Sequence, residues 1–216
     1  MRYIPALLLI LISEAVAISA DELSSPMEGT VAVIVSSEKP TPEPVLQAMR
    51  REVEMLVSAA GIQVVWPTQL QAASQSYPRL ALITLQGQCQ TNAKISAPLR
   101  FNRALPILGK THVVDGKVLP IADLKCDAVH KIIDRDLSAT TDVDQAALMG
   151  RALGRVLAHE LYHILLRTVL HGTVGLARPS QTSQELLAAN TVFAPIDEIK
   201  LSAAFTDSET ATESGR

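Results

Sequence analysis

Short apolar runs and one amphipathic segment alternate along the first half of the chain. Residues 29–35, 62–66 and 79–87 are short and mostly apolar, which is typical of strands in a sheet. Between the first two runs, apolar side chains recur every three or four positions over residues 45–57, and Gly61 ends the pattern, which indicates a helix with one buried face. The order strand, helix, strand, strand predicts an α/β (α+β) fold built on a mixed sheet.

A hairpin is predicted in the middle of the chain. Two further apolar runs, residues 107–114 and 117–124, flank the dipeptide Asp115-Gly116. Both residues of this dipeptide tolerate the positive φ angles of a tight two-residue turn. Pro120 has no backbone N–H to donate, so we expect it at an edge of the sheet or at the end of a strand.

A long helix is expected to begin near Asp142 or Asp144, either of which can cap it, and to run as far as Leu166. It is apolar nearly all round, which is typical of a helix in the middle of a domain. Its polar exceptions lie four residues apart and therefore share one stripe along the helix: Arg151, Arg155, His159 and His163. A buried helix with one polar stripe needs something for that stripe to face.

The first 20 residues have the pattern of an export signal. Arg2 precedes an apolar run, and small residues follow that would suit cleavage after Ala17 or Ala20. The run is shorter than the about 20 residues that a membrane-spanning helix needs, so no membrane span is expected after cleavage. The sequence therefore predicts a secreted or periplasmic protein with residues 1–20 as its signal peptide.

Composition limits the domain organisation, the classes of partner and the state of the cysteines. Residues 21–202 are enough for a single domain, and residues 203–216 contain too few apolar side chains to fold, which predicts a disordered polar tail. A net charge of −3 with three Tyr and three Phe provides neither phosphate neutralisation nor base stacking, so nucleic acid is not an expected partner. Cys89 and Cys126 are the two cysteines, and in an oxidising compartment they are expected to form a disulfide.

The segment HELYH, residues 159–163, carries the candidate chemistry. Side chains four apart on a helix lie one turn above each other, so His159 and His163 can aim two imidazole nitrogens at one Zn²⁺ ion. Glu160 lies beside the same point and can take a proton from a water that the metal activates. This combination predicts hydrolysis of amide bonds.

The stretch AHELYHILL, residues 158–166, resembles the active-site helix of the zincin metallopeptidases, and the predicted layout is similar to that of the metzincin branch. The resemblance implies a zincin-like fold for the single domain: a mixed twisted sheet with an antiparallel edge strand or hairpin, a backing helix and a central active-site helix. It also implies that an extended peptide substrate adds to one arm of the hairpin around Asp115-Gly116.

The chain departs from the metzincin pattern at two places. Leu166 and Val169 stand where that pattern has a glycine and a third histidine, and there is no methionine after Met149 to form a methionine turn. We therefore expect a divergent or minimal zincin.

Two residues are candidates for the third metal ligand. His171 can reach the metal only if the helix ends around residues 167–169, where β-branched residues precede Gly172. Glu185 would instead act as the glutamate of gluzincins does, although the asparagine and aspartate usual around that glutamate are not at matching positions. His171 is the preferred candidate, and Glu185 stays open as the alternative.

These observations predict a monomeric, exported, zinc-dependent peptidase that acts on peptide or protein substrates, with Glu160 as general base and His159, His163 and His171 as zinc ligands. The alternative is a non-catalytic metal-binding or interaction protein on a zincin-like scaffold.

Other polar residues have ordinary structural explanations. Arg151 and Arg155 are expected to form salt bridges, and Tyr162 is expected to pack in the core. His112 is expected on a strand surface and His130 in solvent.

Overall fold

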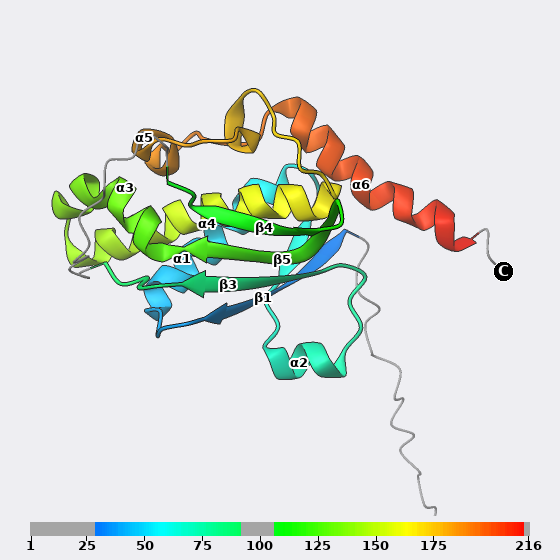
Figure 1. Cartoon of the computed structure of the whole chain (residues 1–216), viewed down its shortest axis with the longest axis horizontal. Helices are drawn as coiled ribbons and strands as arrows, with labels where there is room; N and C mark the ends of the chain where they lie inside the picture. Colours follow the sequence, from blue (N-terminus) through cyan, green and yellow to red (C-terminus); the bar gives the residue numbers. More distant parts are fainter. Residues whose placement is uncertain (1–28, 92–105, 214–216) are drawn as a thin grey trace, which may run out of the picture.

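The computed structural model describes residues 29–91 and 106–213, and a five-stranded mixed sheet lies at its centre (Figure 1). The strand order is β2-β1-β3-β5-β4. The strands are β1 (Thr30–Ser37), β2 (Gln63–Val65), β3 (Leu80–Gln86), β4 (Gly109–Val114) and β5 (Lys117–Lys125). The helices are α1 (Glu43–Ser58), α2 (Gln69–Ser74), α3 (Cys126–Ser138), α4 (Asp142–Leu166), the 3-10 turn η1 (Gly175–Ala177), α5 (Ser183–Leu187) and α6 (Pro195–Glu213).

The sheet is parallel except at one edge. Strands β2, β1, β3 and β5 run in the same direction, and β4 pairs antiparallel with β5 at the edge. The two are joined through Asp115 (φ 50°) and Gly116 (φ 74°), the left-handed pair that a tight hairpin needs. The predicted mixed sheet with an antiparallel edge hairpin is thus confirmed. The predicted signal peptide, residues 1–20, lies outside the described residues.

The expectation that Pro120 lies at an edge of the sheet or at a strand end is wrong, because it lies within β5, an inner strand. The pairing of β5 with β3 begins only at Ile121, and its pairing with β4 is interrupted by a bulge between Thr111 and Val113. Pro120 therefore sits where neither neighbour needs its missing N–H.

Helices α1 and α4 pack against one face of the sheet, α1 beside β2 and α4 across β5 and β4. On this face the alternating side chains of β3 and β5 are buried, whereas Leu80 and Leu82 on the opposite face of β3 are partly exposed. The two helices approach closely because α4 has glycine at the contact: a Cβ on Gly150 would meet the backbone of Val45. Helix α4 is thereby held from two sides, by the sheet and by α1.

Cys89 follows β3 and Cys126 begins α3, and the two form the predicted disulfide with their Cα atoms 4.9 Å apart. The bond ties the exit of β3 to the first turn of α3. None of the helices in the described ranges, 29–91 and 106–213, is long and apolar enough to span a bilayer.

Helix α6 continues to Glu213 and so includes residues 203–213, which the composition predicted to belong to a disordered polar tail (Figure 1). The stretch is polar, but it contains alanine and glutamate and neither glycine nor proline before Gly215. Extending an existing helix by such residues costs much less than starting one.

Candidate metal centre

His159 and His163 lie in the last two turns of α4, and their Nε2 atoms are 3.1 Å apart. Each ring turns its other nitrogen toward a backbone carbonyl. His159 Nδ1 lies 2.9 Å from the Leu176 oxygen, and His163 Nδ1 lies 2.8 Å from the Thr168 oxygen.

These contacts assign the proton of each ring. A carbonyl oxygen can only accept a hydrogen bond, so Nδ1 carries the hydrogen in both histidines and both Nε2 atoms present a lone pair. Burial lowers the pKa of His159 and of His163, which favours the neutral rings. Two lone pairs that face each other at 3.1 Å repel unless a cation lies between them. The pair therefore has the arrangement of metal ligands with carbonyl partners behind them.

The chain reverses directly after the second histidine. Helix α4 ends at Leu166, and Arg167 has the left-handed backbone conformation, with φ 50° and ψ 41°. The N–H of Thr168 then donates to the carbonyl of His163 at 3.1 Å, which closes the helix end. The expected break at residues 167–169 is therefore confirmed.

His171 is returned to the other two histidines by this reversal. Its ring centroid lies 5.2 Å from that of His159 and 4.7 Å from that of His163. One nitrogen of each of the three rings lies within 4.8 Å of the others, so the three can hold a metal ion. The preferred third ligand is thus in the cluster.

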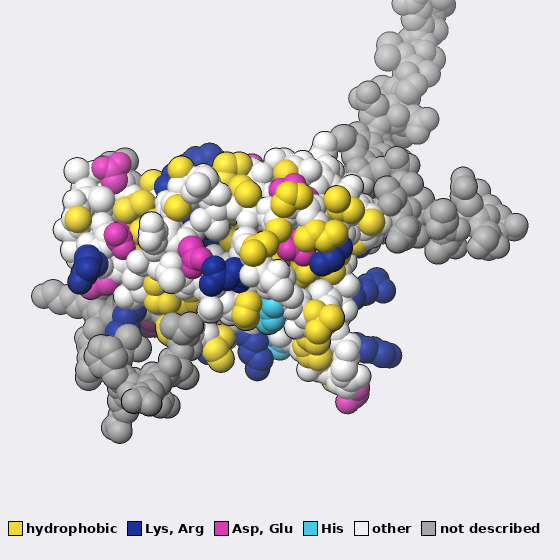
Figure 2. All heavy atoms as spheres, turned by 90° about the horizontal axis from the view of Figure 1, so that it is seen from above, with side chains coloured by type: hydrophobic (Ala, Val, Ile, Leu, Met, Phe, Trp, Pro, Cys, Tyr) yellow, Lys and Arg dark blue, Asp and Glu magenta, His cyan; other side chains and the backbone are white. Residues whose placement is uncertain are grey.

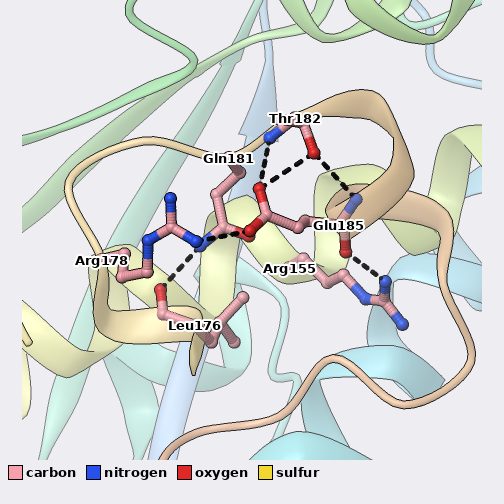
Figure 3. Close-up of polar contacts among 6 residues, drawn as sticks. All are labelled: Arg155, Leu176, Arg178, Gln181, Thr182 and Glu185. Carbon is pink, nitrogen blue, oxygen red and sulfur yellow. Dashed lines mark hydrogen bonds and ion pairs between the residues drawn. The ribbon is translucent and has the colours of Figure 1, made fainter. Parts of the chain in front are cut away.

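Glu185, the alternative ligand, is engaged elsewhere (Figure 3). Its carboxylate accepts from the backbone N–H of Thr182 at 2.8 Å and pairs with Arg178 at 2.5 Å. The hydrogen bonds from Thr182, with the nearby Arg178, lower the pKa of Glu185. This carboxylate caps α5 and is not among the ligands that converge.

Glu160 is buried between the histidines and the edge strand. The hydroxyl of Thr111 on β4 donates to Glu160 Oε2 at 2.6 Å, and Gly109 lies so close that a Cβ there would meet the carboxylate. Burial raises the pKa of Glu160, and the Thr111 hydrogen bond and His163 offset part of that rise. The result is a carboxylate that is more basic than usual and fixed in direction.

A pocket of about 390 Å³ opens over this cluster, lined by β4, by α4 and by the segment after α4. The three histidines and Glu160 all reach it, and β4 contributes Gly109, Lys110, Thr111 and Val113. Among the described residues, 29–91 and 106–213, β4 pairs with β5 alone, so within this part of the chain its other side is an unpaired sheet edge beside the pocket. Figure 2 shows histidine side chains visible on one face of the molecule, beside hydrophobic and basic side chains.

The two arginines of the polar stripe are structural, as predicted. Arg155 is buried and its Nε donates to Glu52 of α1 at 2.8 Å. Arg151 pairs with the same carboxylate at 3.7 Å. Tyr162 is also buried as predicted, and its hydroxyl donates to Asp197.

The other two histidines stay out of the cluster. His112 bonds to Asp123 at 2.9 Å on the neighbouring strand. The expectation that His130 is solvated is wrong, because it is buried with Nε2 3.0 Å from the Thr91 carbonyl oxygen. It shares the buried face of α3 with Cys126 and Ile133, and this helical spacing was visible in the sequence.

The groups that support the candidate ligands could not be predicted from the sequence. Thr111 had no distinguishing signal beyond its place on the predicted edge strand. The carbonyls of Leu176 and Thr168 have no sequence signature, because every residue has one.

No protein-family model matches this chain, and comparisons with curated proteins and with solved structures also found no match.

Proposed function

We propose that this protein is an exported zinc-dependent peptidase with a zincin-like fold. His159, His163 and His171 hold the zinc, and Glu160 is the general base. The observation that carries the proposal is the convergence of three imidazoles beside a buried carboxylate, in a pocket that opens along an unpaired sheet edge.

The donor set fits zinc. With Zn–N bonds of about 2.0–2.1 Å, two ligands of a tetrahedral site are roughly 3.3 Å apart. The Nε2 atoms of His159 and His163 are 3.1 Å apart, which is close to that requirement. Among the described residues no fourth His, Cys, Asp or Glu belongs to the cluster. Three protein ligands with one position left open is the composition of a catalytic zinc site.

A zinc ion bound there would make a water molecule more acidic and polarise a substrate carbonyl. Glu160 accepts the proton at its carboxylate and passes it to the nitrogen of the leaving amine. Thr111 holds that carboxylate in position through Oε2. The carbonyls of Leu176 and Thr168 keep the rings of His159 and His163 in the tautomer that presents Nε2.

The edge strand supports a peptide as substrate. An extended peptide can pair with the free side of β4 and so lie across the pocket, with one of its amide bonds next to Glu160. The antiparallel position of β4 at the edge of the sheet supports the metzincin-like layout that we propose from the sequence. The disulfide between Cys89 and Cys126 supports an oxidising compartment, in line with the predicted export signal.

Metal analysis of the purified protein, combined with cleavage of a peptide library, tests the proposal. We expect one zinc per chain, cleavage that a chelator abolishes, and recovery when zinc is added back. Zinc binding without cleavage of any peptide would favour the non-catalytic alternative. A chain that takes up no zinc would exclude both.

A further inference from the structure

The carbonyl oxygen of Leu176 receives two side-chain donors. His159 Nδ1 lies 2.9 Å from it. Gln181 Nε2 also lies 2.9 Å from it, and Figure 3 draws this second contact. A carbonyl oxygen has two lone pairs, so both are used. One of its two partners is a ligand of the proposed metal centre and the other has no role in the mechanism described above.

We propose that Gln181 is a positioning residue of the metal centre, which acts through the Leu176 carbonyl on the ring of His159. The inference rests on the proposed zinc site. Leu176 belongs to η1, a three-residue turn that lies 17 positions after His159 in the chain. Such a short element does not fix its own orientation, so its carbonyl needs further attachments to stay aimed at His159.

The loop that carries Gln181 is closed by an ion pair. Arg178 lies three residues before Gln181 and Glu185 four residues after it, and the two side chains meet at 2.5 Å. The carboxylate of Glu185 also accepts from Thr182, so the turn that follows Gln181 is capped (Figure 3). Gln181 therefore extends from a loop whose two ends are joined, which limits the directions that its side chain can take.

The same loop is fastened to the helix that carries the ligands. The buried guanidinium of Arg155 donates to the carbonyl oxygens of Glu185 and Ala188, the former at 2.6 Å. Arg155 lies one turn before His159 on α4. Movement of Gln181 relative to His159 is thereby restricted from two directions: through Leu176 and through Arg155.

Gln181 contributes by fixing the position of the Leu176 carbonyl oxygen. Two donors on one oxygen compete for its electron density, so Gln181 does not make the carbonyl a stronger acceptor for His159. It fixes where the oxygen points, and the oxygen in turn fixes the plane of the ring. Loss of Gln181 should therefore weaken the metal site without removing a ligand.

Gln181→Met tests this, because methionine has a similar length and no N–H donor. Zinc affinity is measured by competition with a chromophoric chelator, and the unfolding midpoint of the metal-free protein is measured alongside. We expect zinc to bind about tenfold more weakly, with no change in the metal-free midpoint, because loss of a direct partner of a ligand typically costs about 10- to 100-fold and Gln181 acts one contact further out. Gln184→Met is the matched control, since Gln184 is exposed in the same segment, and it should keep the parental affinity.

A double-mutant cycle with His159→Ala distinguishes positioning of the His159 ring from a general increase in the mobility of the loop. In that background Gln181→Met should produce no further loss of the residual zinc affinity, because the ring on which it acts is absent. Three results would overturn this inference and leave the proposed function standing. The first is parental zinc affinity in Gln181→Met. The others are an equal loss of affinity in Gln184→Met, and an equal loss when Gln181→Met is added to His159→Ala. Absence of zinc from the parent protein would overturn both.

Discussion

At the scale of single residues, Glu160 lies between the cluster of three histidines and the edge strand. Its Oε2 accepts from Thr111, and its helix neighbours on the same side are His159 and His163. Burial favours the protonated form of this carboxyl group, whereas the hydroxyl of Thr111 and the nearby imidazole favour the charged form. This balance suits a group that must accept a proton and then release it.

Glu160→Gln should therefore retain zinc and lose peptide cleavage. Glutamine has almost the same shape and can still contact Thr111, but it cannot accept a proton from water. A loss of at least about 100-fold in the cleavage rate is expected, in line with the usual contribution of a general base. Zinc content and cleavage are measured together, with Glu43→Gln on the exposed start of α1 as the control. Cleavage at the parental rate by Glu160→Gln would remove Glu160 from the mechanism.

The third ligand can be tested by comparing two alanine variants. His171→Ala removes one of three converging nitrogens and should weaken zinc binding by more than about 100-fold. Glu185→Ala removes a cap of α5 that does not reach the cluster, so zinc affinity should fall by at most about tenfold. The reverse order of the two affinities would replace His171 with Glu185 as ligand.

The residues of the site differ in how far the sequence could predict them. His159, Glu160 and His163 could be placed together because one helix fixes their geometry. His171 could be placed only on condition that the helix ended in time, since this depends on one backbone conformation at Arg167. The carbonyl of Leu176 could not be predicted, because its position depends on the path of the whole segment after α4.

At the scale of elements, the end of α4 decides whether the site exists. Arg167 adopts the left-handed conformation that glycine takes at many helix ends. The preceding helix would otherwise carry residues 168–171 away from the first two histidines. An exposed arginine thus stands at a position where the backbone favours glycine.

Arg167→Gly should raise the free energy of unfolding. Relief of the left-handed conformation favours the folded state by roughly 1–2 kcal/mol. The greater conformational freedom of glycine in the unfolded chain lowers the free energy of unfolding by about 0.5–1 kcal/mol. We therefore expect a net gain of up to about 1.5 kcal/mol in the free energy of unfolding, measured with urea on the metal-free protein, with zinc affinity retained.

The control for this change is Arg135→Gly, in the last turn of α3, where the arginine is also exposed but belongs to the right-handed helix. Glycine there should lower the free energy of unfolding by up to about 1 kcal/mol relative to a good helix former. If Arg167→Gly lowers the free energy of unfolding as Arg135→Gly does, the left-handed backbone conformation of Arg167 does not destabilise the end of α4.

Elements with a regular apolar period were predictable, and those defined by context were not. The strands around Asp115-Gly116 and the long helix α4 follow their patterns closely. Helix α6 extends through residues with no apolar period, so only its continuity with an earlier turn accounts for it. The close contact of α1 with α4 depends on Gly150 and Gly154, whose meaning is visible only when the partner helix is in place.

At the scale of the whole molecule, the fold brings the site together from distant parts of the chain. The sheet supplies Thr111 through its edge strand, α4 supplies His159, Glu160 and His163, and the segment after α4 supplies His171 and the supporting carbonyls. Arg155 connects α1, α4 and this segment by bonding to Glu52 and to the Glu185 carbonyl. The sequence predicted the layers of the fold but could not predict the connections made by Arg155, because they join residues 30 and 103 positions apart.

The disulfide is the covalent connection at this scale, and its removal should destabilise the whole domain. Cys89 and Cys126 are separated by 37 positions, and the loop between them includes β4, which borders the pocket. Closing a loop of this length lowers the entropy of the unfolded chain by an amount worth ~4 kcal/mol in the chain-entropy model. The double variant Cys89→Ala, Cys126→Ala should therefore lose about that much free energy of unfolding in urea, and the parent protein should lose a similar amount when it is reduced. Two titratable thiols in the unfolded, unreduced parent would show that the bond does not form, and equal stability of the parent and the double variant would show that it does not hold the domain together.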